Sequence, residues 1–189
     1  LDTVEQALST EEEMDDICDV MRVCIERCFS MSRFITRFAD VVKIPEPTLT
    51  SVDLNDLAFT CKRFMEGMCT DRNITLRLEI DETLKEVKMD ASLFEQVLVN
   101  IIKNAAESIE KDGEIIVRPL SPAIIEVVDN GKGISKETEA KLFSPFFSTK
   151  PNGQGIGLIF IREVLMRHGC TFSLRTYTDG LTRFRILFP

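Results

Sequence analysis

The sequence predicts an α+β fold, a two-layer α/β sandwich that is preceded by a long helix from a four-helix bundle. Two observations indicate the sandwich: beyond residue 47, apolar segments with strand and helix periods alternate, and the last two strands are consecutive in the chain. A third observation indicates the bundle helix, because residues 14–42 carry apolar side chains with a repeat of about 3.5 residues.

The N-terminal part of the chain is predicted to be helical. Leu1 and Leu8 belong to the end of one helix, and Thr10 with Glu13 has the form of a capping box that opens the next. The apolar stripe of this second helix comprises Ile17, Met21, Cys24, Cys28, Met31, Ile35, Phe38 and Val42. One helix cannot bury such a stripe alone, so we expect a homodimer through residues 14–42; the alternative is a single amphipathic helix packed against its own domain.

A domain boundary is predicted where this helix ends. Pro45 and Pro47 cannot continue a helix, and they hold the chain extended. We therefore place one domain at residues 1–47 and a second at residues 48–189.

In the second domain, polar caps before apolar periodicity predict helices, and alternating or short apolar runs predict strands. The expected helices cover residues 53–68, 90–110 and 157–167, and the expected strands cover 74–80, 86–89, 114–118, 124–128, 171–176 and 183–188. Residues 129–156 are rich in Gly, Ser, Pro and Asn and carry few periodic signals, which is typical of a long functional loop.

The composition excludes some classes of function. The net charge is −8, with 31 acidic and 23 basic residues, which argues against a nucleic-acid partner. No apolar run approaches the ~20 residues that a membrane span needs. We expect a cytoplasmic domain; because the chain begins with Leu1, we also expect it to be a fragment, and a membrane anchor can lie elsewhere in the parent protein.

The six cysteines do not form a CxxC pair, and the chain has one histidine. Cys24 and Cys28 stand four residues apart on a predicted helix and could share a ligand. Tetrahedral zinc needs four converging ligands, so the favoured interpretation is reduced thiols that act as small core residues.

Polar side chains share one face of the predicted helix at 90–110. Asn100, Asn104 and Glu107 fall together, opposite the core-facing side chains Phe94, Val97, Leu98, Ile101, Ala105 and Ile109. Amide oxygens are suitable hard ligands for Mg²⁺. Taken alone, however, ordinary exposed polar residues are the more common explanation of such a face.

Two glycine-containing segments indicate close approach of the backbone to a ligand. The first, Asp129-Asn-Gly131-Lys-Gly133, follows an apolar strand, and its carboxylate can accept a hydrogen bond from an exocyclic amine. A plain turn is the alternative. The second has glycines at 153, 155 and 157 and opens a helix, where backbone N–H groups and the positive helix end suit phosphate. A flexible loop is the alternative there.

Between these segments lies Phe143-Ser-Pro-Phe-Phe-Ser-Thr-Lys150, which carries three phenylalanines in a predicted loop. Loops are generally solvated, so we expect these rings to anchor a lid onto the domain. Lys150 can reach a terminal phosphate, with a solvated surface lysine as the alternative.

The order of these segments resembles that of the histidine-kinase branch of the GHKL ATPases, which have the Bergerat nucleotide-binding fold. Residues 100–108 resemble its N box, 129–134 its G1 box, 143–150 its F box and 153–158 its G2 box, and 181–189 are similar to its last strand. The resemblance covers about residues 51–189. The preceding helix resembles the second helix of the family's dimerisation and histidine-phosphotransfer bundle, so residues 1–47 would be a truncated form of that region.

The resemblance implies a Mg-ATP site. Asn104 would bind the Mg²⁺ with support from Asn100, Asp129 would accept from the adenine amine, and Asn100 and Lys150 would be the catalytic residues. The full set of implied cofactor-binding residues is Asn100, Asn104, Glu107, Asp129, Gly131, Gly133, Ile134, Phe143, Thr149, Lys150, Gly153, Gly155, Ile156, Gly157, Leu158 and Thr182.

The implied activity is that of an ATP-dependent protein histidine kinase, whose partner is the receiver domain of a response regulator. Relatives that hydrolyse ATP have a glutamate at the position of Asn100, so weak hydrolysis is expected. The family's phosphorylated histidine lies on a bundle helix that would precede Leu1, and His168 is interpreted as a helix-terminus residue beside Gly169. Two alternatives remain: a nucleotide-binding regulatory module without transfer activity, and a serine kinase of the anti-sigma-factor type.

Overall fold

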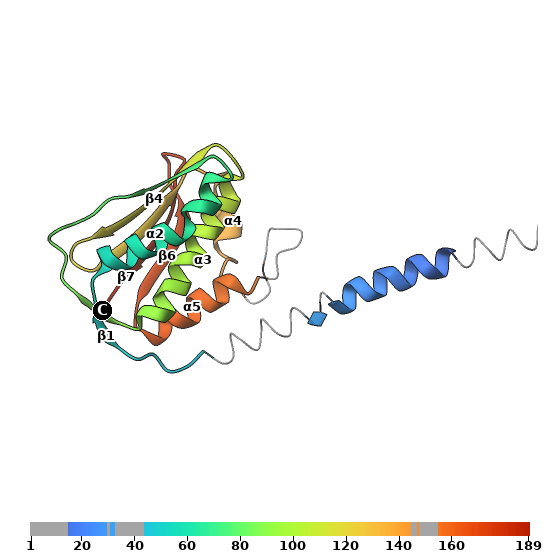
Figure 1. The fold of residues 1–189 in the computed structure, drawn as a ribbon, viewed down its shortest axis with the longest axis horizontal. Coiled ribbons are helices and arrows are strands. Elements are labelled where there is room, and N and C mark those ends of the chain that lie inside the picture. Colours follow the sequence, from blue (N-terminus) through green and yellow to red (C-terminus); the bar gives the residue numbers. More distant parts are fainter. Residues whose placement is uncertain (1–14, 30, 33–43, 145–146, 148–154) are drawn as a thin grey trace, which may run out of the picture. The chain divides into compact units, whose positions relative to one another are not determined.

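The computed structural model describes residues 15–29, 31–32, 44–144, 147 and 155–189. The chain divides into two compact units, residues 1–43 and 44–189. In the first unit the described residues 15–29 and 31–32 are helical (Figure 1). Their side chains are exposed. The expected capping box at Thr10 and Glu13 and the end of the expected helix at 33–42 lie outside the described residues.

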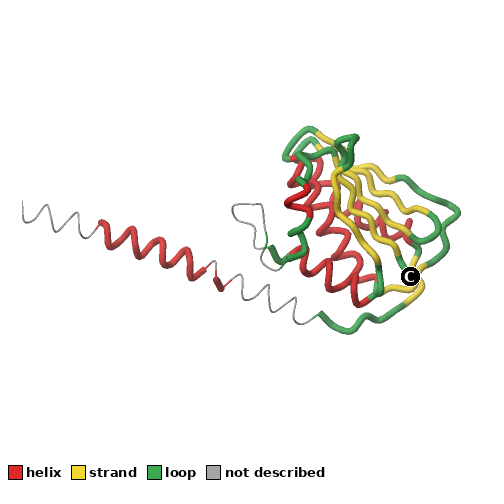
Figure 2. Tube along the Cα trace, turned by 180° about the vertical axis from the view of Figure 1, so that it is seen from behind, coloured by secondary structure: helices red, strands yellow, loops and turns green. Residues whose placement is uncertain are grey.

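The second unit has two layers, with a sheet on one side and helices on the other (Figure 2). The strand order is β2-β4-β5-β7-β6, in which only the β2–β4 pair is parallel. Its strands are β2 (Ile74–Leu78), β4 (Gly113–Leu120), β5 (Ile124–Asp129), β6 (Thr171–Thr176) and β7 (Thr182–Leu187), and its long helices are α2 (Leu54–Thr70), α3 (Ala91–Ile109) and α5 (Gly157–Arg167). The predicted two-layer sandwich is confirmed.

Helix α3 lies at the centre of the helical layer and packs against α2, α5 and the sheet. Its predicted core face is buried at Phe94, Val97, Leu98, Ile101 and Ala105, whereas Ile109 is half-buried. Ile102 and Ala106 are also buried, which widens the apolar face beyond one stripe. The polar residues Asn100, Asn104 and Glu107 remain half-buried on the remaining side.

Several boundaries differ from prediction. Strand β2 ends at Leu78, and Ile80, expected inside it, is 62% exposed. The sequence did not indicate β1 (Thr50–Val52), which pairs with β3 (Val87–Met89) as a separate two-stranded sheet. The expected loop at 129–156 contains a short helix, α4 (Lys136–Glu139), whose N-cap Ser135 accepts from the Thr138 N–H.

Residues 44–47, which were expected at the end of the first domain, belong to the second unit. Ile44 is buried, and Arg167 at the end of α5 donates to its carbonyl oxygen at 2.9 Å. The Thr48 N–H donates to Asp90 Oδ2 at 2.9 Å. These contacts place the division between the units at residues 43 and 44, upstream of the prolines.

Candidate functional site

Asp129 is the last residue of β5, a central strand whose residues are all buried. Its side chain is 7% exposed. Burial raises the pKa of this carboxyl to about 6, although the Gly131 N–H, which donates to Oδ1 at 3.0 Å, acts in the opposite direction. A carboxylate that is buried at the end of a strand is a strong acceptor for a ligand donor.

The loop after Asp129 lies against the C-terminal end of α3. Lys132 N–H donates to the Ser108 carbonyl at 3.3 Å, and a Cβ atom on Gly131 would collide with the Ser108 side chain and lie 2.9 Å from its carbonyl carbon. Gly131 is therefore required by packing within the protein, whereas the sequence had suggested close approach to a ligand. Because Ser108 is one turn beyond Asn104, this contact brings the loop to the polar face of α3.

A chain of hydroxyl groups joins the loop to the last two strands. Ile134 N–H donates to Thr176 Oγ1 at 2.7 Å, and Thr176 Oγ1 lies 3.0 Å from Thr182 Oγ1. Thr182 is buried and pairs with Asp129 in the β5–β7 register. Gly133 has a φ of +76°, and a Cβ there would lie 3.2 Å from Thr176 Oγ1. The sequence analysis did not identify Thr176 as a residue of the candidate site. The Asp179-Gly180 turn sets the β6–β7 register, and it is the signal from which the position of Thr176 could have been predicted.

The start of α5 is suited to an anion. Helix α5 begins at Gly157, as predicted, and its N-cap residue Ile156 makes no side-chain capping hydrogen bond. Gly155 adopts a φ of +65°, and a Cβ on Gly157 would meet no atom within 4 Å. Leu158 is half-buried in the first turn. An uncapped N-terminus presents backbone N–H groups and a partial positive charge.

Phe143 anchors the segment that follows α4. Its ring lies 5.1 Å from the Phe172 ring on β6 and 6.3 Å from the Phe184 ring on β7. Arg162 of α5 donates to the Phe143 carbonyl at 3.3 Å. Phe143 thus packs against the sheet, and Phe147 is half-buried. Phe146 lies outside the described residues, so the anchoring of a lid by the three rings stays a prediction. Thr149, Lys150 and Gly153 lie outside the described residues, so their expected roles stay predictions.

His168 is buried at the C-cap of α5, and Gly169 follows with a φ of +69°. Its Nδ1 lies 2.7 Å from the Val164 carbonyl, and its Nε2 accepts from the Asp90 N–H at 3.1 Å. The ring is therefore neutral with the proton on Nδ1, because a carbonyl needs a donor and an N–H needs an acceptor. Both nitrogens are occupied, which confirms the helix-terminus interpretation.

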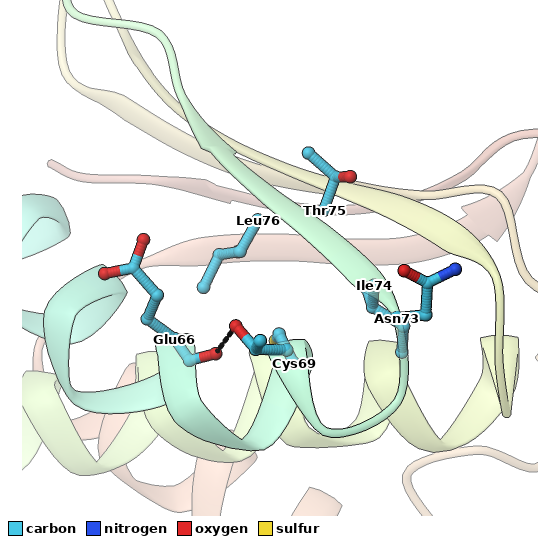
Figure 3. Close-up of a pocket in the computed structure, with 7 residues that line it drawn as sticks. Glu66, Cys69, Asn73, Ile74, Thr75 and Leu76 are labelled. Carbon is cyan, nitrogen blue, oxygen red and sulfur yellow. Dashed lines mark hydrogen bonds between the residues drawn. The ribbon is translucent and has the colours of Figure 1, made fainter.

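A separate cavity of about 300 Å³ lies between the end of α2 and the edge strand β2 (Figure 3). Its lining residues are Glu66, Cys69, Thr70, Asn73, Ile74, Thr75 and Leu76. The Thr70 hydroxyl donates to the Glu66 carbonyl at 2.8 Å, and burial raises the pKa of the Cys69 thiol. The expected nucleotide-binding residues do not contribute to this cavity, so it is distinct from the Asp129 site.

An α/β sandwich with a buried carboxylate at the end of a strand, a polar helix face next to the following loop, and a glycine-containing helix start is typical of a nucleotide-binding class of protein. Residues 89–189 match the sequence profile of the histidine kinase-, DNA gyrase B- and HSP90-like ATPases. This match covers more than half of the chain, and the chain belongs to that family.

The chain is similar to sensor histidine kinases along most of its length. It is 29% identical over 175 residues to the sensor histidine kinase ZraS of Salmonella typhi, covering 90% of this chain and 38% of that protein. It is 33% identical over 162 residues to the C4-dicarboxylate transport sensor protein DctS of Rhodobacter capsulatus, covering 82% of this chain and 25% of DctS. The chain thus spans well under half the length of these relatives.

The fold is similar to solved histidine-kinase structures. The nucleotide-free catalytic domain of ThkA matches with a TM-score of 0.67 and 28% identity, covering 75% of this chain and 95% of that one. Full-length ShkA in complex with AMPPNP matches with a TM-score of 0.73 over 86% of this chain and 36% of that one; at 20% identity this likeness concerns the fold alone.

Proposed function

We propose that this chain is the ATP-binding catalytic region of a sensor histidine kinase. The observation that carries the proposal is the buried Asp129 carboxylate at the end of β5, opposite Thr182 and beside the polar face of α3. A carboxylate in this position can accept a hydrogen bond from the exocyclic amine of adenine. The neighbouring Thr182 hydroxyl adds a second polar group to the same end of the sheet.

The start of α5 is the proposed binding site for the phosphates of ATP. Gly155, Ile156 and Gly157 would present backbone N–H groups to them, and Leu158 would pack beneath the first turn. Lys150, Thr149 and Gly153 are proposed to complete this part of the site. Phe143 would hold the base of the segment that carries them against β6 and β7.

Mg²⁺ is the proposed metal, with Asn104 as its protein ligand and Asn100 and Glu107 beside it on the same helix face. The described residues contain no group of three His, Cys, Asp or Glu side chains that could hold a metal by themselves. A Mg²⁺ ion that is bound mainly by phosphate oxygens and water needs only one or two protein oxygens, so the α3 face fits such an ion. When bound, the ion would neutralise charge on the phosphates.

The proposed reaction is transfer of the γ-phosphoryl group of ATP to an imidazole nitrogen. The bond between the γ-phosphorus and its bridging oxygen breaks, a phosphorus–nitrogen bond forms, and ADP leaves. Activation of a water molecule for hydrolysis needs a base such as a carboxylate, but residue 100 is an asparagine with a neutral amide. This favours transfer of the phosphoryl group over hydrolysis. The acceptor is proposed to lie on another helix, because both nitrogens of the buried His168 are already hydrogen-bonded.

The proposed partner is the receiver domain of a response regulator, to which the phosphoryl group would pass. A solved structure contains the histidine kinase ThkA in complex with the response regulator TrrA, and its fold is similar to this chain with a TM-score of 0.66. A homodimer through residues 14–42 is proposed from the apolar stripe. None of the helices among the described residues is long and apolar enough to cross a membrane. A cytoplasmic location is part of the proposal.

The first test is calorimetric titration of Mg-ATP into the 189-residue chain, beside its Asp129→Asn and Asn104→Ala variants. We expect micromolar to sub-millimolar binding that requires Mg²⁺ and is lost in both variants. Thr171→Val is a matched control, because Thr171 is exposed on β6 away from the hydroxyl chain. A folded wild-type chain that does not bind ATP would contradict the proposal.

The second test adds a histidine-containing bundle helix, in trans or fused before Leu1, and follows transfer of labelled phosphate. The expected product is acid-labile phosphohistidine. Acid-stable phosphoserine would favour the serine-kinase alternative, and ATP binding without any transfer would favour a regulatory module.

A further inference from the structure

Residues 44–52 enter the second unit as a strap that is fixed to it at both ends. Ile44 at the start of the strap is buried, with 5% of its surface exposed. Thr50–Val52 at the other end form β1, which pairs with β3. Pro45 and Pro47 in the middle have no N–H groups, so hydrogen bonds to this part of the strap must use its carbonyl oxygens or the neighbouring N–H groups.

Two side chains from the helical layer hold the middle of the strap. Arg167, the last residue of α5, donates from Nη1 to the Ile44 carbonyl at 2.9 Å and to the Pro45 carbonyl at 3.4 Å. Asp90, the N-cap residue of α3, accepts the Thr48 N–H at Oδ2 at 2.9 Å, while its Oδ1 accepts from the first turn of the helix. The strap is thus tied to the end of one helix and to the start of another.

These two helix ends are also tied to each other. His168, the C-cap residue of α5, accepts the Asp90 N–H at Nε2 at 3.1 Å. Helices α3 and α5 pack against each other, and the end of α5 meets the start of α3 (Figure 1). At 1.5 Å per residue, Gly157 lies about 15 Å from Arg167 along α5, and Asn104 lies about 20 Å from Asp90 along α3. The strap therefore meets both helices at the ends remote from the candidate nucleotide site.

The proposed nucleotide site would join the same two helices at their other ends. The phosphates are proposed at the start of α5 and the Mg²⁺ at Asn104 of α3, so a bound Mg-nucleotide would bridge the helices there. A pair of helices that is joined at both ends has less freedom to slide or tilt than a pair that is joined at one end. The Arg167 guanidinium and the Asp90 carboxylate would then be held at the spacing at which they bind the strap.

We propose that residues 44–52 form a nucleotide-dependent strap, which a bound Mg-nucleotide tightens and for which Arg167 is the positioning residue. The inference rests on the proposed nucleotide site and adds a role for the segment that joins the two units. A held strap makes Ile44 the point at which the chain enters the second unit, whereas a released strap moves this point to β1. The coupling is reciprocal, because release of the strap weakens nucleotide binding by the factor by which the nucleotide favours the held strap.

The test is amide hydrogen exchange of the 189-residue chain, measured by NMR with and without saturating Mg-AMPPNP. The reporter is the Thr48 N–H, because it is hydrogen-bonded to Asp90 in the held strap. We expect AMPPNP to slow its exchange at least about fivefold, the lower end of typical couplings between sites. Arg167→Met keeps the aliphatic part of the side chain but removes its donors. It should speed exchange at Thr48 about tenfold or more and abolish the response to AMPPNP.

Asp90→Asn tests the second anchor without removing the helix cap. Asparagine is as good an N-cap residue as aspartate, but it has one acceptor oxygen, so the Thr48 N–H loses its partner. Neither Asp90 nor Arg167 is assigned to the nucleotide site, yet both variants should bind AMPPNP more weakly. Arg63→Met is the matched control and should behave as the wild type, because Arg63 is exposed on α2 with its guanidinium over the Phe59 ring.

AMPPNP affinity is measured by calorimetry on the same samples, and circular dichroism checks that each variant is folded. The factor by which the two variants lose affinity should equal the factor by which AMPPNP slows Thr48 exchange in the wild type. Thr48 exchange that does not respond to bound AMPPNP would overturn the proposal, and so would wild-type exchange in Arg167→Met. A folded wild-type chain that does not bind AMPPNP would contradict the proposed function and with it the coupling. The nucleotide-free samples would then still show whether Arg167 holds the strap.

Discussion

Asp129 at the end of β5 lies opposite Thr182 at the start of β7, and both side chains are buried. The Thr182 hydroxyl lies 3.0 Å from Thr176 Oγ1, which accepts from the Ile134 N–H at 2.7 Å. One end of the sheet therefore fixes both the acidic residue and the loop that follows it. The candidate site is built from cross-strand pairs, with the loop hydrogen-bonded to them.

Asp129→Asn should stabilise the fold at neutral pH while abolishing ATP binding. The pKa of Asp129 is raised from 3.8 to about 6, so the folded chain holds this proton more tightly than the unfolded chain. The stabilising contribution of the protonated form is complete below pH 3.8 and is lost as pH rises through about 6. At 1.36 kcal/mol per pKa unit, the variant should gain up to about 3 kcal/mol of unfolding free energy at pH 7.

The measurement is urea denaturation of both chains at pH 4 and pH 7.5. The two unfolding free energies should be similar at pH 4 and separate at pH 7.5, with the variant higher. An equal difference at both pH values would show that the substitution acts through packing and that burial of the charge is not its cause.

The affinity for ATP should also depend on whether the Asp129 carboxyl is protonated. A ligand amine that donates to the carboxylate favours the ionised form, so binding releases a proton wherever free Asp129 is protonated. Because the pKa of Asp129 is about 6 in the free chain, the dissociation constant should rise about tenfold per pH unit below that value. Calorimetry at pH 5 and pH 7.5, in buffers of different ionisation enthalpy, measures both the affinity and the proton release; a flat profile would contradict the role of Asp129.

The sequence alone was sufficient to predict the long helices and strands, and to predict those parts of the candidate site that lie within them. The start of α5 at Gly157 was predicted because glycines at alternate positions give way to an apolar helical pattern. The polar face of α3 follows in the same way from helix periodicity. Such features depend on neighbours within a few residues in the chain.

The remaining features depend on pairing between distant segments. Strand β1 has three residues and exists through its register with β3, far along the chain. The contact between Asp90 N–H and His168 Nε2 joins residues 78 positions apart. The contact of Thr176 with Ile134 requires the register of the last hairpin and the path of a loop together. Local patterns carry no signal for these arrangements.

Thr176→Val should destabilise the loop after Asp129. The substitution keeps the shape of the side chain but removes the acceptor for the Ile134 N–H and the partner of Thr182. Leaving a fully buried donor unsatisfied costs about 1–3 kcal/mol, and the Ile134 N–H is part-buried, so the cost should lie toward the lower end. We expect a loss of about 1 kcal/mol in urea denaturation and weaker ATP binding, whereas Thr171→Val at an exposed position of the same strand should leave both unchanged. Normal ATP affinity in Thr176→Val would contradict a positioning role for the hydroxyl chain.

Gly131→Ala and Gly67→Ala should change stability in opposite directions. A Cβ on Gly131 would lie 2.8 Å from Asp129 Oδ1 and 2.9 Å from the Ser108 carbonyl carbon, so α3 or the loop must shift. Overpacking of this kind costs about 1–3 kcal/mol. A Cβ on Gly67, inside α2, would meet no atom within 4 Å, and alanine there should stabilise the helix by up to about 1 kcal/mol. Thermal denaturation of the two variants compares them directly, and a neutral Gly131→Ala would show that the loop does not pack on α3 in solution.

His168→Gln should weaken the fold without removing phosphotransfer. Its neutral ring links Asp90 N–H to the Val164 carbonyl and packs edge-on against the Phe94 ring at 4.8 Å between centroids. Glutamine can keep one polar contact but loses the ring, so we expect destabilisation of about 1–3 kcal/mol. When a histidine-containing bundle helix is supplied, the folded variant should still yield phosphohistidine on that helix at 10 °C, where the variant remains folded. Loss of phosphate incorporation in a sample with normal ATP binding would instead identify His168 as the acceptor, and would require its buried ring to leave the helix terminus during each turnover.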